Sequence, residues 1–456
     1  MKTTLSDWEK YPSYQEYLNK MNGFAANYPQ LCELVDIGQS TKGKQLLAIK
    51  ITNKNSVAEK PVSFYSAAIH GDEGAGFILM LRLIDYLLTH FESDEEINQL
   101  LNNSINYINP LANPDGFYYL NDSTHYGATR FNSNHVDLNR NFPDPDEGNH
   151  PDGNEWQPET KAFMQFMEDV NILLSANFHD GSELLNYPWD TWEKLHADNN
   201  WFIRVCRAYA DTVHSSSPLS YFDDLDNGIT NGYQWYTISG GRQDYVTYFL
   251  QAREVTVELS KIKSPVGNDL ELLWHYNKQS LIQYLMNSLD GIYGKVTDAF
   301  TGETIKAAIS VTGYDSDYSS VYSDENGMFY RMILPGLHNL EINASGYKTT
   351  YFPANVPSKG RTFVNAQLEP DDKTDGLADI YINSFTGDVF IPLSDSFVGM
   401  VRIEVYDVSG RLMFNSWLDM NYSGILEFNP GYLHPGVYIV QIINNTLKKR
   451  YKVIKR

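Results

Sequence analysis

The sequence has few cysteines, few basic residues for its length and no long apolar run. Its two cysteines, Cys32 and Cys206, cannot form a disulfide framework, and we expect both to be ordinary core residues. Lys and Arg number 35 against 57 Asp and Glu, and the formal charge of -22 argues against nucleic acid as a partner, because a phosphate backbone requires a basic surface. No stretch reaches the ~18 apolar residues of a membrane span. The polar segment 1–21 contains no apolar signal core, so the signal peptide of an exported form is not in this sequence.

Apolar residues make up 42% of the 456 residues and aromatic residues 14%, which suffices for packed cores and excludes a wholly disordered chain. The length predicts about two to four domains. An acidic protein attracts cations, including metal ions and basic peptides, although most such charge is ordinarily a solvated surface.

Up to about residue 290, short apolar runs alternate with segments of helical periodicity. Strands are expected at 32–37, 45–51, 105–108, 172–178 and 255–259, and helices at 11–21, 76–88 and 159–170. Ser13 is the expected N-cap of the first helix, and residues 42–44 the expected turn of a hairpin. This alternation predicts an α/β fold with a largely parallel or mixed central sheet and helices on both faces.

From Gly291 the pattern changes to short β-like runs separated by Gly, Asp, Asn and Pro, without helical periodicity. This change predicts two small all-β sandwiches after the α/β part. The expected domains are residues 1–290, 291–368 and 378–456, with the polar, turn-rich segment 369–377 as a linker.

The apolar run 62–65 leads directly into a candidate metal site. His70 and Glu73 follow it, and Gly71 between them can supply a sharp turn that faces both side chains toward one point. His and carboxylate are ligands that Zn²⁺ accepts, and a catalytic zinc takes three protein ligands plus a water. The residue types alone also fit an ordinary surface ion pair.

A third ligand is expected at the end of another central strand, because open α/β sheets bind ligands at the carboxyl ends of their strands. His179 closes the buried run 173–178 and completes a His₂Glu zinc site with an open position for water. Such a water needs a carboxylate to accept its proton and to pass it to the leaving amine. Glu258, in the β-branched run 255–259, is the best candidate, because an acid on the buried side of a strand is costly without a task. Simple alternation along the strand would instead turn Glu258 to solvent.

Residues 10–290 resemble the zinc metallocarboxypeptidases, the family of the pancreatic carboxypeptidases, in a series of motifs that stand in the family's order. These motifs are His70-Gly71-Asp72-Glu73, Asn113-Pro114-Asp115-Gly116, Arg130-Phe131-Asn132-Ser133-Asn134, Asp137-Leu138-Asn139-Arg140-Asn141-Phe142, His179, Asn186-Tyr187-Pro188, Asn227-Gly228-Ile229-Thr230-Asn231-Gly232, Trp235-Tyr236, Gly240-Gly241-Arg242-Gln243-Asp244 and Val257-Glu258-Leu259. The resemblance implies that His70, Glu73 and His179 bind one zinc ion in the catalytic domain. It also implies that Glu258 is the general base and acid.

Further roles follow from this resemblance. Arg130 resembles the residue that polarises the scissile carbonyl and stabilises the oxyanion, a role in which one positioned donor contributes ~3 kcal/mol. Asn139, Arg140 and Tyr236 resemble the group that grips the terminal carboxylate of the substrate, and an Arg fork matches a carboxylate bidentately. The expected substrates are therefore the C-termini of peptides or proteins. The alternative for Arg140 is a surface ion pair with a neighbouring Asp.

Asp190 and Gln243 resemble pocket residues of the regulatory branch, carboxypeptidases D, E, M and N, in which an Asp selects C-terminal Lys or Arg. A buried carboxylate rejects apolar side chains, because they would leave it desolvated and unpaired. Thr191-Trp192-Glu193 after the Asp, and Arg242 beside Gln243, depart from the pattern of that branch.

The two β units also carry resemblances. Residues 291–296, 330–336 and 344–347 are similar to the transthyretin-like sandwich that follows the catalytic domain in the regulatory branch. Residues 405–411 and 433–440, with the basic end of the chain, resemble the C-terminal sorting domain of the type IX secretion system of Bacteroidota. This implies a protein that is secreted or held at the outer cell surface of such a bacterium, with the type IX machinery as a partner. A generic adhesion or carbohydrate-binding sandwich is the alternative.

Two other functions stay open. An inactive binding protein with this fold would have lost ligands or the base, whereas this sequence retains a residue for each role. A zinc hydrolase of peptidoglycan stem peptides or other amides is the second alternative, and the carboxylate-gripping residues favour ordinary peptide C-termini over it.

Overall fold

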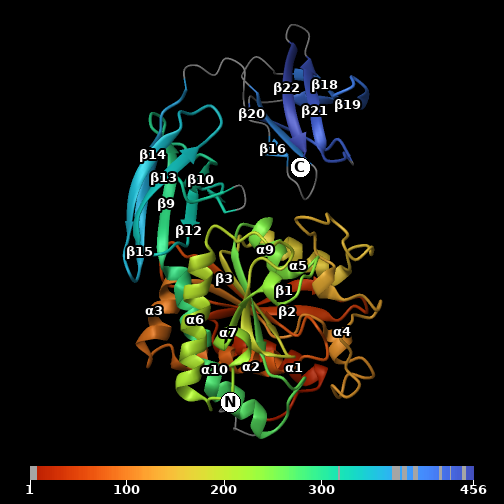
Figure 1. The fold of residues 1–456 in the computed structure, drawn as a ribbon, viewed down its shortest axis with the longest axis vertical. Helices are drawn as coiled ribbons and strands as arrows, with labels where there is room; N and C mark the ends of the chain where they lie inside the picture. The colour runs from red at the N-terminus through yellow and green to blue at the C-terminus, as the bar shows by residue number, and fades with distance from the viewer. Residues whose placement is uncertain are drawn as a thin grey trace.

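The computed structural model describes residues 8–316, 319–371, 381–382, 388–393, 399–420, 424–431, 433–443 and 448–455. Its largest element is an eight-stranded sheet, which lies in the lower half of Figure 1. The order of its strands is β1-β2-β4-β3-β5-β8-β6-β7. The strands are β1 (Cys32–Gln39), β2 (Gln45–Ile51), β3 (Val62–Ala67), β4 (Ile105–Asn109), β5 (Leu174–His179), β6 (Glu183–Tyr187), β7 (Ile229–Asn231) and β8 (Arg253–Leu259). Parallel pairs (β3 with β4 and β5, β5 with β8) adjoin antiparallel ones (β1 with β2, β6 with β8), so the predicted mixed sheet is confirmed.

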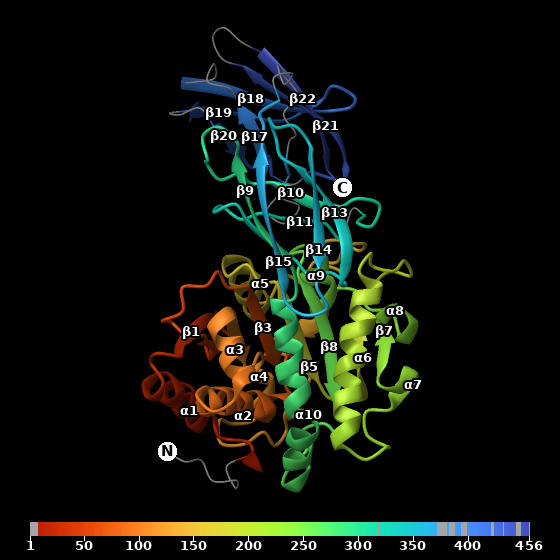
Figure 2. The ribbon, with the colours of Figure 1, turned by 90° about the vertical axis from the view of Figure 1, so that its left-hand side faces the viewer.

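Helices cover both faces of this sheet. They are α1 (Tyr14–Asn27), α2 (Ala75–His90), α3 (Glu95–Asn103), α4 (Pro114–Phe117), α5 (Pro158–Asp169), α6 (Asn199–Ser216), α7 (Asp224–Asn227), α8 (Gly232–Trp235), α9 (Arg242–Tyr248) and α10 (Asn268–Met286). One apolar core joins one face of the sheet to α1, α2, α6 and α10, and a second core joins α5 and α9 to the other face (Figures 1 and 2). This two-sided cover explains why β5 and β8 are buried at every position.

Most of the predicted elements are found within a few residues of their expected bounds. Ser13 caps α1, since its side chain accepts from the backbone of Glu16 while the Glu16 carboxylate accepts from the backbone of Ser13. The expectation missed α3, α6 and α10, together with the short strands β6 and β7. β7 has only three residues, too few for a recognisable alternation.

A second group of strands follows, and we call residues 291–368 the middle sandwich. Its strands are β9 (Gly291–Asp298), β10 (Ala308–Val311), β11 (Val321–Tyr322), β12 (Met328–Arg331), β13 (Gly336–Asn343), β14 (Thr350–Val356) and β15 (Arg361–Leu368). They form a four-stranded sheet, β11-β10-β13-β14, and a three-stranded sheet, β12-β9-β15, which enclose one apolar core. The all-β expectation for this segment is thus met.

The last part of the chain forms two further small sheets, with strand orders β16-β17-β20 and β19-β18-β21-β22. Their strands are β16 (Tyr381–Ile382), β17 (Val389–Leu393), β18 (Gly399–Asp407), β19 (Leu412–Met420), β20 (Gly424–Phe428), β21 (Gly436–Ile443) and β22 (Lys448–Lys455). Residues 372–377 of the expected linker, and 378–380 at the expected start of this unit, lie outside the described residues.

Two exclusions drawn from composition can be compared with the structure. Cys32 and Cys206 are both buried free cysteines, as expected of core residues. Within the described ranges, no helix combines the length and apolar character needed to cross a membrane.

Candidate metal and substrate site

The loop after β3 carries the first two predicted ligands. Ala68 has a positive φ of 56°, so this alanine, rather than Gly71, takes the left-handed backbone conformation. Gly71 lies in the turn for a different reason: a Cβ there would approach the backbone carbon of Gly116 to 2.2 Å. The glycine is therefore required by close backbone packing, which the sequence-based interpretation did not foresee.

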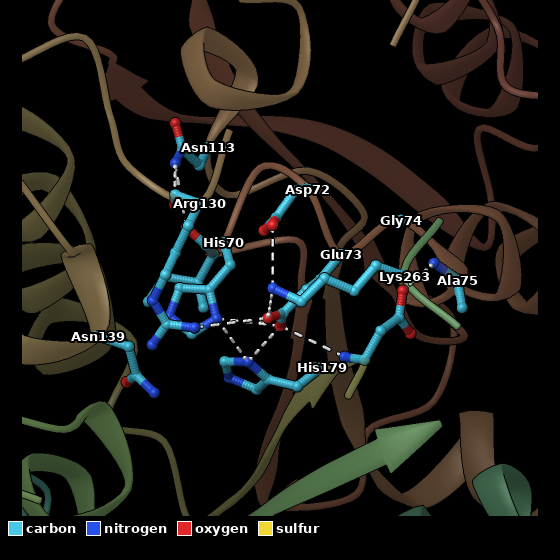
Figure 3. A network of polar contacts seen from close by, with 12 residues as sticks. His70, Asp72, Glu73, Gly74, Ala75, Asn113, Arg130, Asn139, His179 and Lys263 are labelled. Atoms are coloured by element: carbon cyan, nitrogen blue, oxygen red, sulfur yellow. Dashed lines mark hydrogen bonds and ion pairs between the residues drawn. The ribbon is translucent and has the colours of Figure 1, made fainter. Parts of the chain in front are cut away.

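His70, Glu73 and His179 converge on one point (Figure 3). Nδ1 of His70 lies 3.0 Å and Nδ1 of His179 lies 2.8 Å from Oε2 of Glu73, and the two ring nitrogens are 3.1 Å apart. Each residue is only 3% exposed. This is the only group of three His, Cys, Asp or Glu residues in the described part of the chain whose ligand atoms lie within 4.8 Å of one another. The buried geometry excludes a surface ion pair, and two imidazoles with one carboxylate fit a zinc ion.

The protonation of two of these side chains, His179 and Glu73, suits metal binding. Burial acts to lower the pKa of His70, but Glu73 and Asp137 outweigh it and raise that pKa. Burial lowers the pKa of His179 to about 4, which keeps this imidazole neutral near pH 7, as a metal ligand must be. Burial acts to raise the pKa of Glu73, but His70 and His179 outweigh it and hold that pKa well below its ordinary value. Glu73 is therefore a carboxylate.

Asp137 is a site residue that sequence reasoning missed. Its Oδ1 lies 3.1 Å from Nε2 of His70, and its Oδ2 accepts a hydrogen bond of 2.8 Å from Nε of Arg130. A carboxylate behind a metal-binding His fixes the orientation and tautomer of the ring. Its sequence signal was its place two residues before Asn139, but its partner His70 is 67 residues away.

Lys263 is a second missed residue. Its Nζ lies 3.1 Å from Oε1 of Glu73 and 2.9 Å from Oδ2 of Asp72 (Figure 3). The next residue, Ser264, accepts from the backbone N–H of Gly74 and donates to the carbonyl of Asp72. The segment after β8 thus holds the loop that carries Glu73.

Glu258 lies beside the three converging side chains. Glu258 lies opposite His179 in the register of the parallel strands β5 and β8, and it is only 7% exposed. The alternative that Glu258 faces solvent is therefore wrong. Its Oε2 is buried without a hydrogen-bond partner. Burial first, and then the charges of Glu73 and Asp180, raise the pKa of Glu258 to about 8. A buried carboxyl group of this kind is suited to exchanging protons.

A cleft of about 220 Å³ opens from this point, and nine of the ten predicted site residues line it. They are His70, Glu73, Arg130, Asn139, Arg140, His179, Asp190, Tyr236 and Glu258. The tenth, Gln243, contacts the cleft residue Asp190.

Asn139, Arg140 and Tyr236 form one wall of this cleft. Asn139 accepts a hydrogen bond of 2.9 Å from the backbone N–H of Arg242 through its Oδ1, which orients the amide. Arg140 donates from Nη1 to the carbonyl of Asn139. No ion pair joins Arg140 to a carboxylate among the described residues, so its guanidinium can bind the carboxylate of a ligand. Tyr236 is 48% exposed at the cleft.

Asp190 lies buried at another wall, 2% exposed. Its Oδ1 accepts from Nδ2 of Asn186 at 2.9 Å and from Nε2 of Gln243 at 3.0 Å. Burial raises the pKa of Asp190 to about 6. Asp244, whose role the sequence did not reveal, accepts from the backbone N–H of Asp190 and so holds the segment in place. Gly232 leaves room for the carboxylate, since a Cβ there would lie 1.7 Å from Oδ1 of Asp190.

Three of the residues that depart from the regulatory branch, Thr191, Trp192 and Arg242, have partners other than the Asp190 carboxylate. Arg242 is fully buried and pairs with Glu254, at 3.0 Å between Nε and Oε1. Thr191 donates its backbone N–H to Asp244, and Trp192 packs its ring against Trp189 at 5.3 Å. Arg242 therefore does not neutralise the carboxylate of Asp190.

Comparison with known proteins decides the family. The model of the family "Zinc carboxypeptidase" matches residues 17–280. The chain belongs to the zinc carboxypeptidase family. Carboxypeptidase M of Mus musculus is 33% identical over 358 residues, which are 75% of this chain and 80% of that protein. The carboxypeptidase N catalytic chain of Rattus norvegicus is 33% identical over 380 residues, with 75% and 82% covered.

Other relatives differ more in length or sequence. Carboxypeptidase D of Homo sapiens is 31% identical over 415 residues, but the match spans only 29% of that protein. Two solved structures, thrombin-activatable fibrinolysis inhibitor at 19% identity and the carboxypeptidase A of Helicoverpa armigera at 21%, share the fold, each with a TM-score of 0.52. Each covers 62% of this chain and 74% of the other. The chain is thus a metallocarboxypeptidase, and the family implies the zinc ion that the His₂Glu cluster fits.

The end of the chain has a separate relative. The model "Secretion system C-terminal sorting domain" matches residues 379–456, which agrees with the resemblance to the type IX sorting domain. This match indicates a secreted protein or one at the outer surface. The alternative of a generic adhesion sandwich is set aside by it.

Proposed function

We propose that this metallocarboxypeptidase removes one C-terminal residue from peptides, with a preference for Lys or Arg. One observation supports this most directly: a single cleft combines the His₂Glu cluster, the guanidinium of Arg140 and the buried carboxylate of Asp190. A C-terminal Lys or Arg offers the complementary charges, an anion for Arg140 and a cation for Asp190.

His70, Glu73 and His179 are the proposed ligands of one zinc ion. When bound, zinc supplies Lewis-acid polarisation of the substrate and a water of lowered pKa. The pKa of Glu258 falls when a divalent cation is held close by, because positive charge favours the carboxylate. Glu258 then accepts the proton of the attacking water and delivers it to the leaving amine.

Arg130 is the proposed donor to the scissile carbonyl oxygen. Its Nε is committed to Asp137, which fixes the guanidinium plane, its Nη1 lies 3.6 Å from Oε1 of Glu73, and the residue lines the cleft. A donor positioned in advance stabilises the developing oxyanion without reorganisation.

Arg140, Asn139 and Tyr236 are the proposed grip on the terminal carboxylate. Their place in the same cleft as the zinc ligands limits hydrolysis to the last peptide bond, because a bond further inside the chain has no carboxylate to present. Asp190 and Gln243 are the proposed selectors of a basic side chain. An apolar residue there would leave the Asp190 carboxylate desolvated and unpaired.

The domain division is also part of the proposal. Residues 1–290 form the catalytic domain, 291–368 a transthyretin-like domain, 369–377 a linker and 378–456 a sorting domain read by the type IX machinery of a Bacteroidota-type bacterium. The match to a sorting model supports the last assignment.

The test is hydrolysis of peptides that differ only in their last residue, each with a free or an amidated C-terminus. We expect the fastest cleavage for peptides that end in Arg or Lys. We also expect a chelator to abolish activity and added zinc to restore it. Cleavage of amidated peptides would indicate an amide hydrolase with another substrate, such as peptidoglycan stems. Equal rates on C-terminal Arg and Phe would refute the basic preference.

A further inference from the structure

A buried group of four charged side chains joins the catalytic part to the middle sandwich. Asp198 and Arg253 come from the catalytic part, and Asp315 and Arg331 from the sandwich; we call them the charge quartet. Each side chain is at most 2% exposed. Such burial of four charges is stable only where every charge has a partner in good geometry.

Asp198 is the centre of the quartet. Its two carboxylate oxygens accept a forked pair of hydrogen bonds from Arg331, at 2.7 Å to Oδ2 and 2.9 Å to Oδ1. Its Oδ2 also accepts from Nε of Arg253 at 2.9 Å. Arg331 contacts Asp315 of its own sandwich as well. The two positive and two negative charges balance across the contact.

The contact continues as apolar packing. Met332, directly after Arg331, belongs to the apolar core of the catalytic part and is 2% exposed. Figures 1 and 2 show the strands of the sandwich adjoining the catalytic part in both views. Forked hydrogen bonds and a shared core leave one docked orientation rather than a loose association.

Asp198 is connected to the substrate pocket through its own chain segment. Its backbone N–H donates to Nδ1 of His196 at 2.9 Å, and the His196 ring packs on Trp189 with centroids 5.1 Å apart. Trp189 directly precedes Asp190. Arg253 begins β8, the strand that carries Glu258. The quartet therefore braces both the pocket segment 189–198 and the strand of the proposed base.

We propose that Arg331 of the middle sandwich is a positioning residue of the substrate pocket, acting through Asp198 on the segment that carries Asp190. The specificity part of this inference rests on the proposed preference for basic C-terminal residues. The sandwich is then a working part of the pocket and not an appended module.

The test uses a double variant of the full chain, Asp315→Asn with Arg331→Met. It removes together the two charges that the sandwich contributes to the quartet and leaves Arg253 paired with Asp198. Asn at position 315 can still accept hydrogen bonds. We expect KM for a C-terminal Arg peptide to rise about tenfold, with kcat and zinc binding within twofold of wild type. Backbone hydrogen exchange in segment 189–198 is expected to become about tenfold faster.

The matched control is Arg361→Met. Arg361 is another sandwich arginine that reaches the catalytic part, where it donates to the carbonyl of Glu59 away from the pocket segment. We expect this variant to keep the wild-type KM. If it raises KM equally, or if the double variant lowers only the melting temperature, the quartet has no specific effect on the pocket and the inference is wrong.

Two further arms keep the outcomes separable. Arg331→Lys retains the positive charge but cannot form the forked pair of hydrogen bonds to Asp198, so it should give an intermediate KM. If the double variant fails to fold, an unchanged KM in Arg331→Lys would overturn the inference. A wild-type protein that does not cleave C-terminal Arg peptides refutes the proposed function instead. The exchange rates of segment 189–198 still test the brace in that case.

Discussion

Replacing Asp190 by Asn is the sharpest test of the specificity pocket. The change removes one negative charge while it keeps the volume of the side chain and the neighbours Asn186 and Gln243. Asp190 is 2% exposed, so a C-terminal Arg or Lys bound there would form a desolvated ion pair. Loss of one partner of such a pair costs about 3–5 kcal/mol. This corresponds to a decrease of kcat/KM by a factor of roughly 150 to 5000.

The assay compares two peptides that end in Arg and in Phe and are otherwise identical. Asp190→Asn should lower kcat/KM for the Arg peptide by this factor of roughly 150 to 5000. It should leave kcat/KM for the Phe peptide unchanged or increase it, because the desolvated charge is gone. Asp122→Asn, which removes an exposed carboxylate of the ion pair with Lys44, is the control and should change neither value. An unchanged Arg-to-Phe ratio in Asp190→Asn would show that another residue selects the side chain.

Three further predictions concern pH, the proton carrier and the metal. Because burial raises the pKa of Asp190 to about 6, its carboxylate is mostly protonated at pH 5 and mostly ionised at pH 7. KM for the Arg peptide should therefore fall as pH rises through 6, while KM for the Phe peptide does not follow this titration. Parallel pH profiles of KM for the two peptides would contradict the assignment. Glu258→Gln should reduce kcat by about 10²–10⁴-fold with zinc affinity retained, measured by steady-state kinetics and metal titration, and near-normal turnover would exclude Glu258 as the base. Removal of zinc by a chelator should lower the unfolding free energy by about 4 kcal/mol relative to protein held in zinc at about 1000 times its Kd. The variant His70→Ala should show no such zinc-dependent change in unfolding free energy. A change of wild-type size in that variant would place the metal elsewhere.

Much of the site was predictable because its side chains stand at positions that local patterns mark. His70 follows a buried strand, His179 ends one and Glu258 interrupts another, and parallel neighbouring strands bring such ends together. The resemblance of the intervening motifs then assigned Arg130 and Arg140 to the same cleft. Periodicity likewise located α2 and the hairpin of β1 and β2, since these depend on neighbours along the chain.

The missed residues share a physical cause. Asp137 contacts His70 across 67 residues, and Lys263 contacts Asp72 across 191, so no local pattern marks either as a partner of the ligands. Gly71 was assigned a turn role, whereas its absent side chain makes room for the backbone of Gly116. Such contacts depend on how separate segments pack.

The sequence by itself predicted the candidate ligands, the acid and arginine residues that line the cleft, the mixed α/β architecture and the β units that follow it. These depend on side-chain chemistry and on short-range periodicity. Only the tertiary structure decided that Arg242 turns to Glu254 and leaves the charge of Asp190 in place. It also decided that Asp198 and Arg331 join the sandwich to the pocket segment. The physical reason is that the direction and burial of a charged side chain are set by partners distant in the chain, and burial determines what that charge does.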